Sequence, residues 1–356
     1  MKIALITCYK DPNYVRGQVI KRCLSDISGV EVLEVKNRQT NPFRFIEVIY
    51  KLIKVRKLNP DIYFLTFRGQ EILPFVLFLA KHKPVIFDEF IVPMAWSTEE
   101  KHDISLKNII FGLITRIVNP MYKKWLNRCQ IILSDTKPDA EISSKLSGVS
   151  ISKYKTLPVS ADESVFKKQE PKSKESFSVF YYGNMLPLHG LPYVLEAAKL
   201  TSQEDVHFII AGGGRLVQGQ INKAISSGAR ITYYSWIKYD KLIDYIADSD
   251  LCLGGPYGGT PQADRVITGK TYQFLASQRP VLIGESKANQ YFIDKRNSII
   301  AKQASVKDLV EKILWAKNNP QELTRISENG YKLYQEHYSN SVITKSLESI
   351  IQSVKI

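Results

Sequence analysis

The hydrophobic and polar positions of this chain change between two patterns along most of its length. Short apolar runs, such as KIALITC at 2–8 and PVIFDEF at 84–90, contain few polar interruptions. Such runs are typical of strands buried on both faces of a parallel sheet, and the amphipathic stretches between them predict helices. Because strand and helix alternate, the pattern predicts an α/β fold with doubly wound parallel sheets.

The alternation is interrupted once, by a polar stretch that follows Leu157 and contains Pro158 and Pro171. It restarts with the apolar run FSVFYYG, and 356 residues suit two domains of roughly 150 residues each. The expected division is a first domain at 1–160, a linker at 161–176, a second domain at 177–338 and a helix at about 339–356 that packs back on the first domain.

Charge is distributed unevenly between the two halves. The whole chain carries a net charge of +14, and residues 1–160 hold 25 basic and 15 acidic side chains. Basic residues interleave with long apolar side chains at 43–58 and 107–128, as in helices that lie on a membrane surface. The same spacing also fits helices that pack on a sheet with their lysines in solvent. We expect a phosphorylated ligand or an anionic membrane surface as partner, and no nucleic acid, because no known readout module is present.

Composition and short motifs indicate which classes of protein the chain can belong to. With 44% hydrophobic and 24% charged residues, the chain is expected to fold as a globular protein. Its apolar runs are far shorter than the ~20 residues that span a bilayer, and its start lacks a basic leader with a cleavage site. We therefore expect a cytoplasmic location, with contact to the inner face of the cell membrane as an option. The four cysteines show no CxxC spacing, so neither disulfides nor a metal site is expected.

Glycine-rich turns follow several of the expected strands. In FYYGNMLPLHGLPYVLEAAK, at 180–199, Gly183 ends a strand and His189 and Gly190 precede a helix. AGGGR at 211–215, which includes Gly213, and GGPYGGT at 254–260 repeat the theme. Strand ends in parallel sheets and helix N-termini bind anions, so a phosphate is expected here. The plain alternative is a surface histidine in a strand-to-helix turn.

A lysine stands where a helix is expected to begin. Thr268 or Gly269 can cap a helix that runs to about Ser277, which places Lys270 in its first turn. A cation there opposes the helix dipole, so Lys270 suits a position beside a bound anion. Arg265 precedes the same helix and Gln273 follows one turn later. The alternative is that both cations simply reach solvent.

These residues resemble the GT-B glycosyltransferases of family 4, glycosyl transferases group 1, of the bacterial polysaccharide type. GNMLPLHGLPYVLEAA is similar to that family's strand-turn-helix motif, and ITYYSWIKYDKLIDYIADSDLCLG to its loop that holds the nucleotide base. GKTYQFLASQRPVLIG is similar to the stretch that ends the E-x7-E pair. The resemblance extends over nearly the whole chain. It implies a GT-B fold, in which two Rossmann-like domains face a central cleft.

The resemblance also implies an activity. The expected reaction is transfer of a sugar, with retention of configuration, from a nucleotide-diphosphate sugar to a hydroxyl group. The acceptor would be a sugar or a lipid-linked molecule, in surface polysaccharide or glycolipid synthesis. No cofactor and no metal are expected, because cations and helix N-termini would stabilise the diphosphate leaving group.

Several site positions depart from the family's pattern. Asn184 stands where the family usually has Arg, and His189 where it has Lys; Arg265 and Gln273 replace the two glutamates. The resemblance implies that His189 donates to phosphate and that Gln273 binds ribose hydroxyls, while Arg265 and Lys270 replace the missing charge. Bound diphosphate would raise the pKa of His189 above its usual value of about 6.5, so affinity should rise as pH falls through neutrality.

The expected site residues fall into three groups. The catalytic group is Asp88, which would position the acceptor hydroxyl, with His189, Arg265 and Lys270. The acceptor side also includes Glu89 and Asp135, although all three carboxylates could instead be helix caps or surface groups. The donor-binding group is Gly17, Gly183, Asn184, Gly190, Gly213, Trp236, Ile237, Thr268 and Gln273.

Other functions remain open at this point. An epimerase of the same fold would act on the nucleotide sugar without an acceptor. A non-catalytic partner subunit of a glycosyltransferase is an alternative because both carboxylates of the E-x7-E pair are missing, and it could fail to bind any nucleotide sugar. A module that binds anionic lipid or nucleic acid would lose affinity with salt and would ignore nucleotide sugars.

Overall fold

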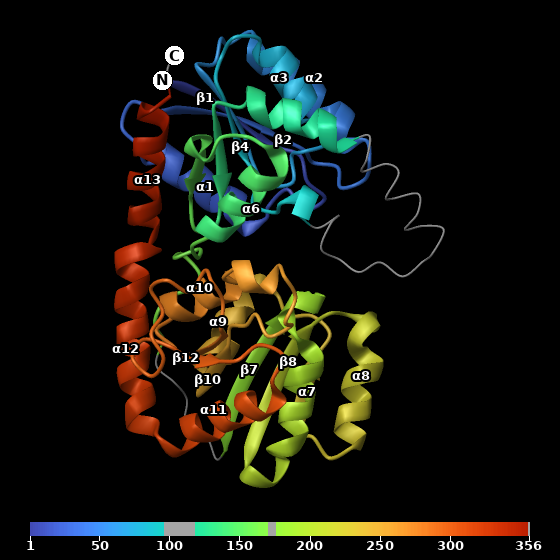
Figure 1. The fold of residues 1–356 in the computed structure, drawn as a ribbon, viewed down its shortest axis with the longest axis vertical. Helices are drawn as coiled ribbons and strands as arrows, with labels where there is room; N and C mark the ends of the chain where they lie inside the picture. The colour runs from blue at the N-terminus through green and yellow to red at the C-terminus, as the bar shows by residue number, and fades with distance from the viewer. Residues whose placement is uncertain (96–117, 170–175, 355–356) are drawn as a thin grey trace. The chain divides into compact units, whose positions relative to one another are not determined.

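The computed structural model describes residues 1–95, 118–169 and 176–354, and it divides into two compact units (Figure 1). Unit 1 consists of Met1–Val159 and Asn340–Ile356, and unit 2 of Ser160–Ser339. Some of the expected features fall outside the described residues: 107–117 of the basic stretch, 170–175 of the linker and 355–356 of the last helix. Among the described residues, no helix has the length and apolar character needed to cross a bilayer.

Unit 1 is built on a six-stranded sheet in which every neighbouring pair is parallel. The predicted apolar runs form its central strands, which are buried on both faces. The strand order is β2-β1-β3-β4-β5-β6. The strands are β1 (Lys2–Thr7), β2 (Glu31–Lys36), β3 (Ile62–Leu65), β4 (Val85–Asp88), β5 (Ile131–Ser134) and β6 (Tyr154–Thr156).

Helices cover both faces of this sheet because successive strand residues point to opposite sides. Ile3 and Leu5 of β1 pack in one core with α1 and α13, whereas Ala4 and Ile6 pack in the other with α2 and α3. The helices are α1 (Val15–Ser25), α2 (Arg44–Arg56), α3 (Leu73–Ala80), α6 (Lys137–Ser147) and α13 (Asn340–Gln352), and residues 118–128 are also helical.

The last described helix of the chain, α13, belongs to unit 1. Ile343 and Leu347 of α13 are buried in the same core as Val19 and Ile20 of α1. The sequence pattern predicted that this helix packs on the first domain. The linker differs from the expectation, because Phe166 is buried and packs against Tyr239 of unit 2, with ring centroids 5.3 Å apart. Residues 161–169 are therefore part of unit 2.

Unit 2 repeats the architecture with a second six-stranded parallel sheet, in the order β12-β11-β10-β7-β8-β9. Its strands are β7 (Phe177–Gly183), β8 (Val206–Gly212), β9 (Ile231–Tyr234), β10 (Leu251–Leu253), β11 (Val281–Gly284) and β12 (Ile299–Ala301). Its α-helices in the described residues are α7 (Leu191–Leu200), α8 (Arg215–Ser226), α9 (Leu242–Ala247), α10 (Gly269–Ala276), α11 (Val306–Asn318) and α12 (Pro320–His337).

Candidate active site

The strand order of unit 2 marks one place on its sheet for a ligand. The chain passes from β7 to β8 and β9 on one side, and then continues from β10 to β12 on the other side of β7. In doubly wound sheets the carboxyl ends of the two strands at such a reversal form the ligand-binding crevice. Gly183 ends β7 and Gly254 follows β10, so two of the glycine-rich turns meet at this point.

Two of the glycines have positive φ angles that favour glycine. Gly190 begins α7 with φ +73°, and a Cβ atom there would lie 2.7 Å from the backbone carbon of Tyr257. Gly183 has φ +148°, and a Cβ atom there would lie 3.5 Å from the ring of His189 and 3.6 Å from Nζ of Lys270. The side chains of His189 and Lys270 therefore converge over Gly183.

Lys270 is a buried cation in the first turn of α10. Its side chain is only 6% exposed, and its Nζ lies 4.9 Å from the ring centroid of Tyr181. Among the described residues this Nζ has no hydrogen-bond partner. Burial lowers the pKa of Lys270 to about 7, because a charged ammonium group loses its hydration there. An anion placed at Nζ would restore the lost interactions.

His189 presents a second polar atom at the same place. Its Nδ1 is buried and has no hydrogen-bond partner in the described part of the chain, and its carbonyl accepts from the hydroxyl of Tyr181 at 2.9 Å. Burial and the nearby Lys270 together lower the pKa of His189 to about 2. The ring is therefore neutral in the free protein, whereas the sequence analysis expected it to titrate near neutrality.

Thr268 and Gln273 complete the surroundings of Lys270. Thr268 occupies the N-cap position of α10, but its hydroxyl donates to the carbonyl of Gly254 instead of capping the helix. The N-terminus of α10 thus keeps its positive end uncapped by a side chain. Gln273, one turn later, is buried, and its Oε1 has no partner among the described residues.

The other expected residues of unit 2 lie outside its strands and α-helices. Asn184 is exposed directly after β7, and Gly213, with φ +73°, follows β8. Trp236 is 70% exposed and Ile237 half-buried in the loop after β9. Arg265 ends a short 3-10 helix ahead of α10, and its Nη1 donates to the carbonyl of Pro261 at 2.9 Å. The expectation that Arg265 replaces the positive charge missing at Asn184 and His189 stays a prediction.

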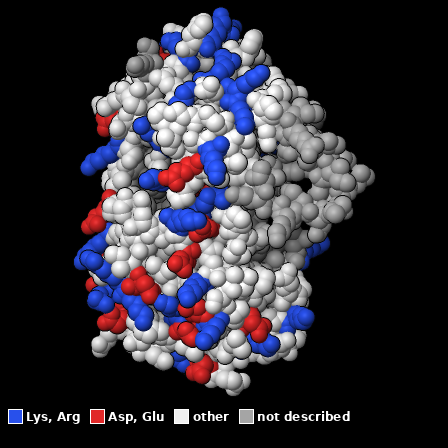
Figure 2. All heavy atoms as spheres, in the orientation of Figure 1, with Lys and Arg blue, Asp and Glu red and all other residues white. Residues whose placement is uncertain are grey.

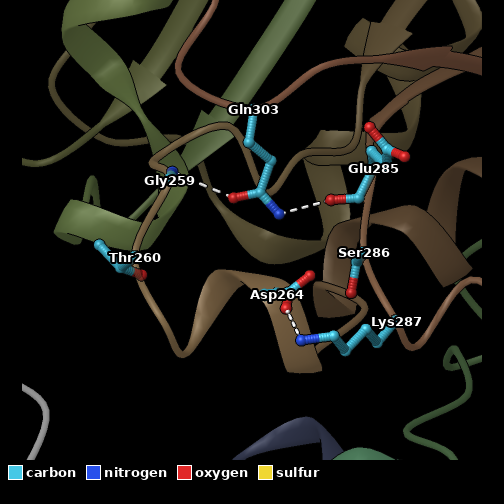
Figure 3. Close-up of a pocket in the computed structure, with 7 residues that line it drawn as sticks. All are labelled: Gly259, Thr260, Asp264, Glu285, Ser286, Lys287 and Gln303. Atoms are coloured by element: carbon cyan, nitrogen blue, oxygen red, sulfur yellow. Dashed lines mark hydrogen bonds and ion pairs between the residues drawn. The ribbon is translucent and has the colours of Figure 1, made fainter.

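A polar pocket of about 560 Å³ lies beside the ends of β11 and β12 (Figure 3). Gln303 bridges its walls: its Oε1 accepts from the amide of Gly259 at 3.0 Å, and its Nε2 donates to the carbonyl of Glu285. On the opposite side Lys287 pairs with Asp264 at 2.6 Å. This pocket offers hydrogen-bonding groups to a polar ligand. Its wall at Gly259 and Thr260 belongs to the predicted glycine-rich turn at 254–260, whereas no sequence pattern pointed to its other lining residues.

In unit 1, Asp88 ends β4 and is fully buried against Arg16 of α1. The Nε and Nη2 atoms of Arg16 donate to the two carboxylate oxygens of Asp88, both at 2.8 Å, and its Nη1 donates to the carbonyl of Leu157 at 3.0 Å. Asp88 is 0% exposed, so the fork-to-fork pair occupies the carboxylate that was expected to position an acceptor hydroxyl.

Asp135 and Glu89 lie at the same edge of this sheet in different surroundings. Burial, with Asp139 and Asp88 nearby, raises the pKa of Asp135 well above its usual range, although Arg16 opposes this shift. Its Oδ1 has no hydrogen-bond partner among the described residues. Burial raises the pKa of Glu89 to about 7, although it accepts from the hydroxyls of Tyr122 at 2.7 Å and Ser143 at 2.6 Å. Of the three carboxylates expected on the acceptor side, only Asp135 thus has a carboxylate oxygen without a hydrogen-bond partner among the described residues.

Gly17, the one expected donor-binding residue in unit 1, lies in α1. It is half-buried, and a Cβ atom there would meet nothing within 4 Å. Sequence reasoning missed Arg16, the residue before it, and Tyr181, whose ring faces Lys270. For Arg16 no sequence signal was present, because its partner lies 72 residues away. For Tyr181 a signal existed, since it lies two residues before Gly183, near the end of the strand that leads into the predicted glycine-rich turn.

Comparisons with known proteins give a family match for most of unit 2. Residues 176–319 match the family model of glycosyl transferases group 1. The match includes β7, α7, α10 and the turn at Gly183, that is, every element that places Lys270 and His189. It supports a glycosyltransferase activity for the chain. No curated protein sequence matches the chain.

Solved structures match the whole chain and show its fold. Anabaena HepE in complex with UDP-glucose has a TM-score of 0.72 at 13% identity, covering 99% of this chain and 100% of that one. Sucrose-phosphate synthase from Thermosynechococcus elongatus has a TM-score of 0.74 at 12% identity, covering 99% and 98%. A glycosyltransferase from Rickettsia africae has a TM-score of 0.70 at 10% identity, covering 99% and 97%. The chain therefore has the GT-B fold that the family resemblance implied.

Proposed function

We propose that the protein is a glycosyltransferase that moves a sugar from a nucleoside diphosphate sugar to a hydroxyl acceptor. The observation that carries the proposal is the pair of buried polar atoms over Gly183, Nζ of Lys270 and Nδ1 of His189. A buried cation without a counter-ion is costly, and a diphosphate supplies the charge that this site lacks. The matched family and the UDP-glucose held by HepE support a nucleotide sugar as the ligand.

In this proposal unit 2 stabilises the leaving group. As the bond from sugar to phosphate breaks, negative charge develops on the diphosphate, and Lys270 with the N-terminus of α10 would stabilise it. His189 would add one neutral N–H donor. Retention of configuration, transfer without a metal and synthesis of a surface polysaccharide or glycolipid remain parts of the proposal that rest on the resemblance.

On the acceptor side the structure favours Asp135 over Asp88. Both oxygens of Asp88 accept from Arg16, whereas Oδ1 of Asp135 has no partner among the described residues. We assign Asp135 to the acceptor hydroxyl and Arg16 with Asp88 to positioning. Glu89 is held by two hydroxyls, which suits a structural role.

The test uses calorimetry of nucleoside diphosphate binding to the full chain. Lys270→Met should weaken binding by about 1.5–3 kcal/mol, the cost of losing a charge-assisted hydrogen bond. Lys307→Met, which removes an exposed cation of α11 already paired with Glu311, is the matched control and should bind like the wild type. Unchanged binding in Lys270→Met would overturn the assignment. Binding with conversion of the nucleotide sugar in the absence of an acceptor would favour an epimerase, and failure to bind any nucleotide sugar would favour a non-catalytic subunit.

The pH dependence of binding tests the same site. With a pKa of about 7, Lys270 is charged below pH 7 and loses its proton above it. An anion binds the charged form, so affinity should be highest below pH 7 and fall by up to about tenfold per pH unit above it, after correction for the ligand's own protonation.

Two variants separate the residues that could cause this dependence. Lys270→Arg keeps its charge at every pH and should flatten the profile. His189→Ala should keep the profile and bind more weakly throughout. A flat profile in His189→Ala, with the wild-type profile in Lys270→Arg, would show that His189, and not Lys270, causes the pH dependence of binding.

A further inference from the structure

Two neighbouring helices of unit 1 expose large apolar side chains. On α2 and the residue before it, Phe43, Ile46, Tyr50 and Ile53 are all exposed. They fall at helical spacing on the side opposite Val48 and Leu52, which are buried in the core. Apolar residues on the outward face of a surface helix indicate that something covers that face.

Helix α3 continues the same surface. Phe75 is exposed and Phe78 is 74% exposed, opposite Leu73, Val76 and Leu77, which share the core cluster of Val48 and Leu52. Helices α2 and α3 pack side by side on one face of the sheet, so their outward sides point the same way. We call the exposed apolar side chains of the two helices the α2–α3 face: Phe43, Ile46, Tyr50, Ile53, Phe75 and Phe78.

The charges around the α2–α3 face are almost all positive. Residues 36–60 contain seven basic side chains and one acidic side chain, Glu47. Glu47 accepts from Lys51 at 2.6 Å and from the amides of Arg38 and Gln39, and these contacts lower its pKa to about 2. Figure 2 shows Lys and Arg side chains gathered over α2 and α3 at the top of the view.

The positions of individual lysines separate structural from outward-facing charge. Lys51 donates to Glu47 and to the carbonyl of Lys36, so its ammonium group is hydrogen-bonded within unit 1. Lys54 lies over the ring of Tyr50, with Nζ 4.3 Å from the ring centroid, and Lys57 is exposed one turn later. An aromatic ring with a lysine head over its face suits the boundary between acyl chains and head groups.

We propose that the α2–α3 face docks unit 1 on an anionic lipid bilayer. Phe78, Phe75, Ile46 and Ile53 enter the head-group layer, and Lys54 and Lys57 contact lipid phosphates. Lysine is depleted at protein–protein interfaces, so a basic and apolar surface of this kind favours lipid over a protein partner. This inference is independent of the donor site.

The experiment measures co-sedimentation of the full chain with two kinds of vesicle. One is phosphatidylcholine alone, and the other is phosphatidylcholine with an equal amount of phosphatidylglycerol. The protein should bind the second kind more tightly, and added salt should weaken that binding. Equal binding to both kinds at low salt would overturn the proposal.

Charge and apolar variants test the assigned residues separately. Lys54→Gln and Lys57→Gln should each weaken binding about fivefold, since one cation near an anionic surface is worth about 1 kcal/mol. The matched controls, Lys223→Gln and Lys307→Gln in unit 2, should leave binding unchanged. Phe78→Ser should weaken binding about tenfold or more, whereas Leu200→Ser, at another exposed apolar residue, should not.

Two further measurements separate this proposal from its competitors. Sedimentation of the free protein reports self-association, and a dimer that Phe78→Ser dissociates would assign the α2–α3 face to a second copy and overturn the lipid proposal. Calorimetry should show unchanged nucleoside diphosphate binding in all α2–α3 variants, and Lys270→Met should bind vesicles like the wild type. Failure of either site is thus distinguishable from failure of the other.

Discussion

In unit 1 the buried cation Arg16 donates to both oxygens of Asp88 and to the carbonyl of Leu157, whereas in unit 2 the buried cation Lys270 has no hydrogen-bond partner among the described residues. Both lie near the carboxyl edge of a six-stranded parallel sheet. The first arrangement completes its charge pairing within the chain and serves stability. In the proposed function a ligand completes the pairing of the second, and the difference would then separate a structural charge from a recognition charge.

The largest expected effect follows from breaking the pair in unit 1. Arg16→Met should destabilise unit 1 by about 3–5 kcal/mol, because it leaves the carboxylate of Asp88 buried without its counter-ion. Urea unfolding would measure the loss, and hydrogen exchange at β4 would report on unit 1 separately from unit 2.

A double variant is the control for this prediction. Arg16→Met combined with Asp88→Leu removes both charges and should recover most of the lost stability, since paired apolar replacements are often close to neutral. A loss below about 1 kcal/mol in Arg16→Met alone would contradict the prediction, because the pair would then stabilise unit 1 no more than a surface salt bridge does.

Removing the buried cation of unit 2 should stabilise the ligand-free protein at pH 7, in contrast to the loss of stability expected for Arg16→Met. Burial lowers the pKa of Lys270 from 10.5 to about 7, so the unfolded chain binds more protons between these values. The wild type therefore gains stability relative to Lys270→Met as pH rises from 7 towards 10.5, by about 2 kcal/mol between pH 7 and pH 9.

Free energies of unfolding of both proteins at these two pH values test this prediction, without any ligand. At pH 7 the Lys270→Met variant should be the more stable of the two. If the difference between the proteins does not change with pH, Lys270 keeps an ordinary pKa and is not a buried unpaired cation.

The smallest expected effect concerns Trp236, which is 70% exposed in the loop after β9. If this ring stacks on the nucleotide base, Trp236→Ala should weaken nucleoside diphosphate binding by about 1 kcal/mol, and inorganic diphosphate should bind both proteins equally. Calorimetry with the two ligands makes the measurement. An equal loss for both ligands would show that the loop acts on the diphosphate site instead.

Much of the fold follows from local pattern. The buried runs of β1 and β4 and the last described helix, α13, lie close to where the sequence predicted them, because strands buried on both faces leave a continuous apolar run. The position of Lys270 in the first turn of α10 was likewise predictable from Gly269.

The site itself depended on contacts that no local pattern contains. The pairing of Asp88 with Arg16, 72 residues away, decides that Asp88 is occupied. The hydroxyl of Thr268 turns to Gly254 instead of capping α10, which only the tertiary structure can dictate. Burial beside Lys270 makes His189 neutral, so the titration expected of the histidine moves to the lysine.

The return of α13 to unit 1 also bears on how the protein is made. Ile343, Leu347 and Ile351 complete the core that Val19 and Leu24 begin, and they are synthesised after every residue of unit 2. On the ribosome, unit 2 can therefore close its core first, while unit 1 keeps an open apolar face until translation reaches α13. The nascent first half is thus the state in which this protein most needs protection from aggregation.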